Sequence, residues 1–302
     1  MEAAKRKETI VQNIAYMAIM AAINVIFVLL TTLVPVLLFL IVFVLPLTSV
    51  IVTLHCKKRY FPIYAIATVG LCMLVTIWRI DDTIFYVIPS IISGFVFGFL
   101  IEKKFPSFWI IFITTVLQIG STYASIPLIE AMFGRNIIDV FAAAFGLSDF
   151  KYLAFVVPCF IFFISLAQEI IAFIIIKNEL PKFGYELQDP KHLPLSLFIS
   201  LVSSVSLAFL FMFIYGPLGY LFSLFSIFFG IYTLVYLINE RNLFIYISLP
   251  TAFIAALFLF AALYGLVDKP LGLIFSNIFF FLEAIIVLSN NYLLKHRNIG
   301  TI

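Results

Sequence analysis

Ten runs of mostly apolar residues follow one another along the chain, separated by short polar or proline-containing breaks. A helix needs about 20 such residues to cross the hydrocarbon of a bilayer, and each run approaches that length. The pattern predicts spans near 10–31, 33–54, 61–77, 84–101, 107–130, 152–176, 193–214, 218–238, 243–264 and 271–294. The third run is short and the Gly216-Pro217 turn is tight, so nine and eleven spans are the alternatives. The expected fold is all-α and polytopic.

Composition supports a membrane protein. Of the 302 residues, 64% are hydrophobic and 11% are charged, and the mean hydropathy is +1.20. A soluble domain carries roughly 45–50% apolar and about 25% charged residues, so this chain has too little charge to cover a soluble surface. The net charge of +3 is small, and the basic residues lie in short clusters between apolar runs. Both features argue against nucleic-acid binding. The lipid bilayer is the expected environment. No cleavable signal peptide is expected, because the first apolar run is longer than the hydrophobic region of such a peptide.

The positions of the basic residues predict an orientation. With the N-terminus inside, fourteen of the 18 Lys and Arg residues fall in cytoplasmic segments. The other four, Arg79, Arg135, Lys151 and Lys269, fall outside, and none lies within a span. Cytoplasmic loops carry the excess of Lys and Arg in membrane proteins. We therefore expect both termini in the cytoplasm and a multi-pass protein of the bacterial plasma membrane.

The longest cytoplasmic loop, residues 177–192, is polar and contains Pro181 and Pro190. It divides the chain into a six-span membrane region, residues 1–176, and a four-span C-terminal region, residues 193–302. No internal repeat is evident, so the two regions are not expected to form equal inverted halves.

Ionisable groups at bilayer depth are expensive and are candidates for function. Two acidic residues lie within the spans, Glu169 and Glu283, and Glu130 lies at the outer edge of the fifth span. No Lys or Arg lies within a span to pair with them, so each must be protonated, hydrated, or paired with a bound cation or a hydrogen-bond donor. Glu283 is a candidate proton or cation site. The alternative for both is a neutral carboxylic acid that hydrogen-bonds a neighbouring helix, a role we expect of Glu283 more than of Glu169.

The fifth span carries a polar stripe. Thr114, Gln118, Ser121 and Ser125 recur at helical spacing and lie on one face. Gln118 and Glu169 sit at broadly similar depth on adjacent spans, so we predict a substrate-binding site formed by these five residues. Interhelical hydrogen bonding is the alternative explanation of the stripe.

Two groups of small residues predict close helix packing. Ser90, Gly94 and Gly98 form a surface of the G-x-x-x-G type, expected to pack within the monomer. Ala18 and Ala22 make a small face on the first span, which could receive another subunit.

The chain lacks the sequence motifs of several classes of enzyme. The chain contains no phosphate loop, no H-E-x-x-H motif and no G-x-S-x-G motif, so we expect no enzyme and no cofactor. The three cysteines, Cys56, Cys72 and Cys159, are far apart, which favours neither a disulfide framework nor a metal site.

The chain resembles a known family in the order of its features. Ala18-x-x-x-Ala22 is followed by Leu45-Pro46-Leu47, the basic turn 57–59, and a helix with Ser93-Gly94 and Gly98 that ends in Glu102-Lys103-Lys104. This run resembles the YybS-like bacterial membrane proteins, which are similar to substrate-binding (S) components of energy-coupling factor transporters. The S-component likeness covers residues 10–176.

The resemblance implies a six-helix capsule with an outward-facing pocket. It also implies docking through Ala18 and Ala22 onto a transmembrane coupling subunit that is driven by a pair of separate ATPases. The four additional spans depart from the S-component pattern. Membrane transport by a small-solute-binding subunit without its own ATPase is the leading hypothesis. A proton- or cation-coupled secondary transporter and a non-transporting membrane scaffold are the alternatives.

Overall fold

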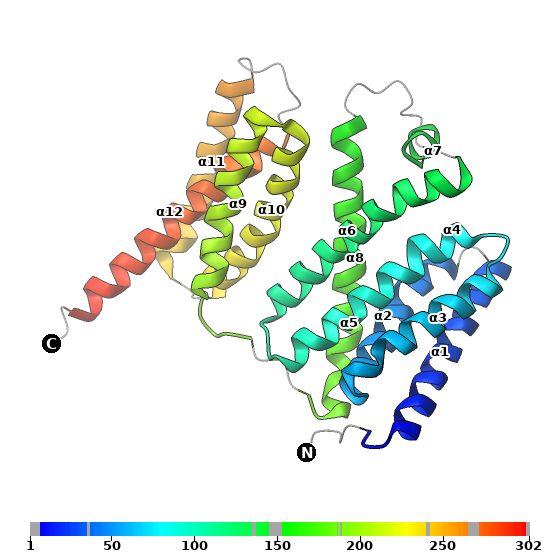
Figure 1. The fold of residues 1–302 in the computed structure, drawn as a ribbon. Coiled ribbons are helices and arrows are strands. Elements are labelled where there is room, and N and C mark those ends of the chain that lie inside the picture. The colour runs from blue at the N-terminus through cyan, green and yellow to red at the C-terminus, as the bar shows by residue number, and fades with distance from the viewer. Residues whose placement is uncertain are drawn as a thin grey trace. The chain divides into compact units, whose positions relative to one another are not determined.

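The computed structural model describes residues 7–34, 37–134, 137–144, 153–185, 187, 189–239, 242–264 and 272–299. Within these ranges the regular structure is entirely helical, as the apolar pattern predicts (Figure 1). The elements in chain order are α1 (Ile10–Leu33), α2 (Leu38–His55), η2 (Lys58–Tyr60), α3 (Phe61–Val75), α4 (Ile80–Asp82), η3 (Thr83–Val87), α5 (Ile88–Glu102), α6 (Ser107–Phe133), α7 (Ile137–Ala144), α8 (Leu153–Glu179), η4 (Leu180–Phe183), α9 (Leu195–Ile214), α10 (Gly216–Asn239), α11 (Leu243–Tyr264) and α12 (Gly272–Ile299).

Among the described residues, eight helical segments have the length and apolar composition to cross a membrane. They are Ile10–Leu33, Lys58–Val75, Thr83–Glu102, Ser107–Phe133, Val156–Lys182, Leu195–Ile214, Gly216–Asn239 and Leu243–Ala262. The remaining predicted spans, 33–54 and 271–294, correspond to α2 and α12, which contain the shorter apolar stretches Val44–His55 and Phe275–Asn290. The prediction of an all-α protein of the membrane class is confirmed.

The chain forms two compact units. The first contains residues 1–148 and 161–189, and the second contains residues 149–160 and 190–302. Helix α8 therefore contributes its beginning to the second unit and its larger part to the first. The division of the sequence at the loop 177–192 stays a prediction about domains.

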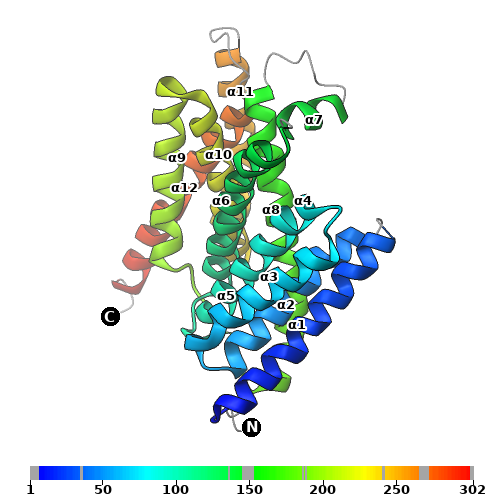
Figure 2. The same cartoon turned by 45° about the vertical axis from the view of Figure 1, so that its right-hand side comes forward.

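In the first unit α2 packs against α5, and α1 packs against both α2 and α3 (Figures 1 and 2). Two glycines of α5 make the α2 contact close. A Cβ atom on Gly94 would stand 2.5 Å from the Pro46 carbonyl oxygen, and one on Gly98 would stand 2.8 Å from the Thr53 Cβ. The predicted packing of this small-residue surface within the monomer is confirmed, because only glycine lets the two backbones approach so closely.

A buried polar network joins α1, α2 and α3. The Asn24 amide donates to the Tyr64 hydroxyl at 2.8 Å and accepts from the Thr48 hydroxyl at 2.7 Å. All three side chains are buried. Since lipid offers no competing hydrogen bonds, such a network fixes which faces of the three helices meet.

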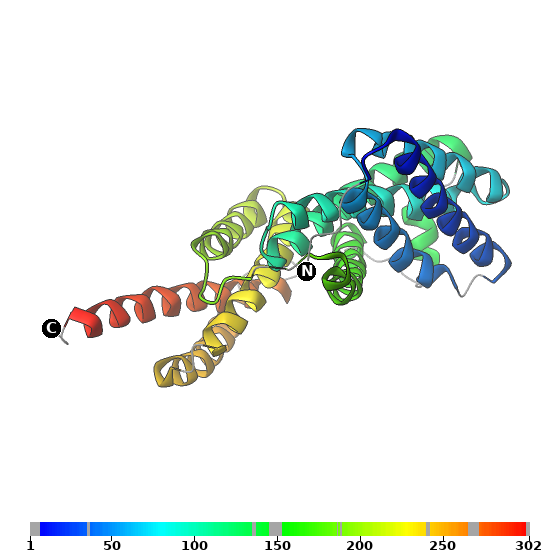
Figure 3. The same cartoon turned by 90° about the horizontal axis from the view of Figure 1, so that it is seen from below.

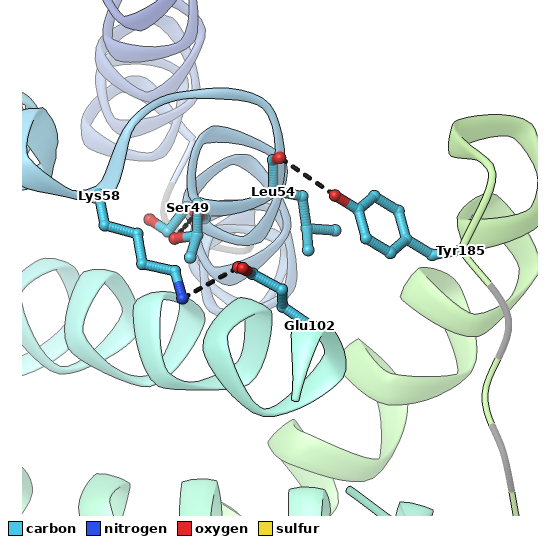
Figure 4. Close-up of polar contacts among 6 residues, drawn as sticks. Ser49, Leu54, Lys58, Glu102 and Tyr185 are labelled. Carbon is cyan, nitrogen blue, oxygen red and sulfur yellow. Dashed lines mark hydrogen bonds and ion pairs between the residues drawn. The ribbon is translucent and has the colours of Figure 1, made fainter. Parts of the chain in front are cut away.

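Polar contacts at one end of these helices hold the loops of the first unit. Lys58 forms an ion pair with Glu102 at 2.9 Å, and the Tyr185 hydroxyl donates to the Leu54 carbonyl at 3.3 Å; Figure 4 shows both, with Ser49 of α2 beside them. At the start of α6, Asp189 accepts from the Ser107 backbone N–H at 2.8 Å and from its hydroxyl at 2.7 Å. A carboxylate is stabilising at this positive end of a helix.

The second unit contains α9 to α12 (Figure 3). Helix α10 packs against α9 and α12, and α11 packs against α12. The Asn277 amide donates to the Ser223 hydroxyl and accepts from the Ser226 hydroxyl, both at 2.6 Å, which ties α10 to α12. Further along α10, a Cβ on Gly230 would collide with the Phe280 ring of α12, so the ring lies directly over the glycine.

Candidate functional site

Helices α5, α6 and α8 bring polar side chains together inside the first unit. The Gln118 amide of α6 donates to the Gln168 side-chain oxygen of α8 at 3.3 Å. One residue further along α8, the Glu169 carboxyl interacts with the hydroxyls of Thr114 on α6 and Ser93 on α5. We call Ser93, Thr114, Gln118, Gln168 and Glu169 the polar cluster.

The polar cluster is held by regular helix geometry and apolar packing. Thr114 and Gln118 are four residues apart, so they share one face of α6. The Phe97 ring of α5 lies 6.0 Å from the Phe173 ring of α8, one helical turn beyond Glu169. Thr114, Glu169 and Gln118 are all buried. The cluster is therefore shielded on the faces where the helices meet.

The hydrogen-bonding capacity of the polar cluster is only partly used. One oxygen of Glu169, the side-chain oxygen of Gln118 and the neighbouring hydroxyl of Thr115 are buried with no partner among the residues that the structure describes. The Thr114 and Ser93 hydroxyls donate to backbone carbonyls of their own helices, which leaves them as acceptors. Buried polar groups are nearly always hydrogen-bonded, so these unpaired atoms need an explanation.

The structure brings together three of the five residues predicted for the substrate site, namely Thr114, Gln118 and Glu169. Ser121 and Ser125, the rest of the stripe, lie further along the same helix. Ser125 is buried, but its hydroxyl donates to the backbone carbonyls of Ile84 and Ser121, and Ser121 is half-buried. The C-terminal end of the stripe thus ties α6 to η3, because the Ser125 hydroxyl donates to the Ile84 carbonyl.

Sequence reasoning did not assign Ser93 and Gln168 to the site. Ser93 lies next to Gly94, and its buried position follows from the close α5 packing that the small residues predict. Gln168 adjoins Glu169. Because it is a second large amide at bilayer depth, the sequence could have identified it as a site residue. Which of these residues meet across helices depends on rotations that the apolar pattern does not specify.

An open cavity of about 460 Å³ lies elsewhere in the first unit. Apolar side chains of α3 and α5 line it, including Ile66, Val69, Met73 and Ile92, and Gly70 leaves space at its wall. None of the predicted site residues lines this cavity. Its wholly apolar wall suits lipid chains better than a polar solute, so we place the candidate site at the polar cluster.

The alanine face and the second glutamate are not members of the polar cluster. Ala18 and Ala22 are exposed on the outer face of α1, opposite the buried Met17, Ala21 and Asn24. Glu283 is fully buried in α12, in the second unit. No group of three or more His, Cys, Asp or Glu side chains that could hold a metal ion occurs in the described parts of the chain.

The chain matches no protein-family model, no curated protein and no solved structure. The indications of function therefore come from the geometry of the polar cluster and from the distribution of Lys and Arg along the sequence.

Proposed function

We propose that the chain is a membrane-transport protein, a small-solute-binding subunit similar to an S component and without its own ATPase. The observation that carries this proposal is the polar cluster, where three helices converge on buried oxygens that have no partner within the described ranges. A solute with hydrogen-bond donors would satisfy the Gln118 oxygen and the free Glu169 oxygen. Such unmet polar groups in an apolar setting are typical of a site that binds a ligand.

The mechanism that we propose is capture followed by reorientation. The solute binds between α5, α6 and α8, and the energy for its release inside comes from partner subunits. The exposed Ala18 and Ala22 support docking onto a transmembrane coupling subunit, because small side chains allow another helix to approach closely. That subunit would connect the chain to a pair of ATPases.

The proposed topology has ten spans, with both termini in the cytoplasm of a bacterial cell. Cysteines introduced in 135–150 and at position 268 should react with a membrane-impermeant reagent outside the cell, whereas cysteines in 178–191 should not. The native background is low at Cys56, because burial raises the pKa of its thiol to about 11 and thiolates are the reactive form. Cys72 is also buried, and Cys159→Ser removes the half-buried third thiol. Labelling of 178–191 from outside would overturn the topology.

The solute site is tested by identifying small molecules that the purified protein retains, using mass spectrometry. The occupancy of the retained molecule is then measured in Gln118→Leu and Glu169→Gln. Each substitution should weaken binding by roughly tenfold to a hundredfold, since loss of a polar partner in a dry site costs about 1–3 kcal/mol. Thermal stability should change little.

Two matched variants serve as controls. Glu130→Gln changes an exposed glutamate of α6, and Ser125→Ala removes a hydroxyl that already bonds backbone; both should keep full occupancy. If Gln118→Leu and Glu169→Gln lose stability while occupancy is unchanged, the polar cluster is structural. Co-isolation with an ATPase pair supports the S-component assignment. Uptake that depends on a proton gradient without ATPases supports a secondary transporter instead, and association with membrane proteins alone supports a scaffold.

A further inference from the structure

Glu283 lies near the middle of α12, which packs against α9, α10 and α11. Its side chain is 0% exposed. It belongs to the second unit, whereas the residues of the proposed solute site belong to the first.

Neither carboxyl oxygen of Glu283 has a hydrogen-bond partner among the residues that the structure describes. The polar bonds between α12 and its neighbours are made by other side chains. Asn277 bonds Ser223 and Ser226 of α10, and Asn290 accepts from Asn242 just before α11. The interhelical hydrogen bond that would make Glu283 a structural residue is therefore not formed in this arrangement.

No opposite charge faces Glu283 from the packed helices. The sequences of α9, α10 and α11 contain no Asp, Glu, Lys, Arg or His, and their ionisable side chains are tyrosines, namely Tyr220, Tyr232, Tyr236, Tyr246 and Tyr264. On α12 itself the next ionisable group is Tyr292, and the first charged groups are Lys295, His296 and Arg297, about three turns further along the helix. An ionised carboxylate in this position would be buried without compensation, which proteins avoid by neutralising the group.

We propose that Glu283 is an intramembrane proton-binding site. The carboxyl group is neutral in the closed arrangement of α9 to α12. When water enters, the O–H bond breaks, the electron pair remains on the carboxyl oxygen, and the proton passes to water. A metal cation requires several oxygen ligands, whereas one carboxyl group is sufficient to bind a proton.

Infrared spectroscopy of the reconstituted protein at pH 7 tests this proposal. A neutral carboxylic acid has a C=O stretching band that is distinct from the bands of an ionised carboxylate and of an amide. The band should be present in the wild type and in Glu169→Gln, and it should disappear when Glu283→Gln is added to the Glu169→Gln protein, in which the other buried glutamate is absent. If Glu283→Gln removes a carboxylate band instead, the group is ionised and the proposal is wrong.

A second measurement does not require a substitution at position 283. In Glu169→Gln protein grown with ¹³C-glutamate, Glu283 is the one fully buried glutamate of the described chain. An acid band that shifts with the isotope and resists exchange into heavy water must then come from a buried glutamate, as expected. Absence of such a band at pH 7 would overturn the proposal whether or not the Glu283 variant folds.

Discussion

The two units differ in how completely their buried polar side chains are hydrogen-bonded. In the first unit Asn24, Thr48 and Tyr64 join three helices, and Glu169 has hydroxyl neighbours on two others. In the second unit an Asn–Ser pair joins two helices, while Glu283 has no hydrogen-bonding neighbour among the described residues. A buried carboxyl group with some, but not all, of its hydrogen-bond partners suits a site that binds a small solute. A buried acid with no such neighbour suits a site whose only ligand is a proton.

The largest expected effect concerns glycine contacts. Gly94→Ala should destabilise the protein by about 1–3 kcal/mol, because its Cβ would meet the Pro46 backbone and a well-packed core does not accept added volume. Gly230→Ala in the second unit should cost less, since a Phe280 side chain can rotate and a backbone carbonyl cannot. Thermal unfolding in detergent measures both.

Gly120→Ala is the matched control for these variants. Nothing lies within 4 Å of a Cβ at this position, and alanine favours helix over glycine by about 1 kcal/mol at most. Its melting temperature should equal or exceed that of the wild type. If Gly94→Ala had the same melting temperature as Gly120→Ala, α2 and α5 would be farther apart than described.

The next effect compares the two hydrogen-bond networks. Tyr64→Phe removes a hydroxyl shared by Asn24 and Thr48 and should cost about 1–3 kcal/mol, because Asn24 is left with an unpaired donor. Ser226→Ala removes one bond to Asn277 and should cost about 1 kcal/mol. Tyr246→Phe, at a half-exposed position, should be neutral. A larger loss in Ser226→Ala than in Tyr64→Phe would contradict the difference between the units.

The smallest effect on stability is expected on the outer face of α1. Ala18→Trp should leave the melting temperature nearly unchanged, since the side chain is exposed and surface changes are usually within about 0.5 kcal/mol. It should nevertheless abolish co-purification with the proposed coupling subunit. Ala21→Trp is the contrast, because Ala21 is buried and the added ring should unfold the first unit. Normal co-purification of Ala18→Trp would exclude docking through this face.

The apolar pattern was sufficient to locate the helices but not to orient them. Each of the ten predicted runs coincides with a helix, because the length needed to cross hydrocarbon is a property of sequence alone. The π-helical turn Thr83–Val87 and the short helix Ile137–Ala144 were not predicted. Both are shorter than a span and carry no distinct signal in hydropathy.

The contacts within the site depended on information that the pattern lacks. Outer faces of these helices are as apolar as the inner ones, as Ile66 and Leu74 of α3 show, so periodicity does not reveal which face turns inward. The convergence of Gln118 with α8 was predicted from polarity and depth. The bond of Ser125 to Ile84 and the Asn24–Tyr64 contact were not, because each depends on how two helices rotate against each other.

Asp189 determines where the chain can be shortened. Its carboxylate bonds Ser107, 82 positions earlier, and so completes the start of α6, on which Gln118 and Thr114 lie. A fragment that ends at residue 185 would contain every residue of the polar cluster but would leave the first turn of α6 without this acceptor. A fragment extended by four residues would keep it. Any reduced version of the protein made for solute binding should therefore end at or beyond residue 189.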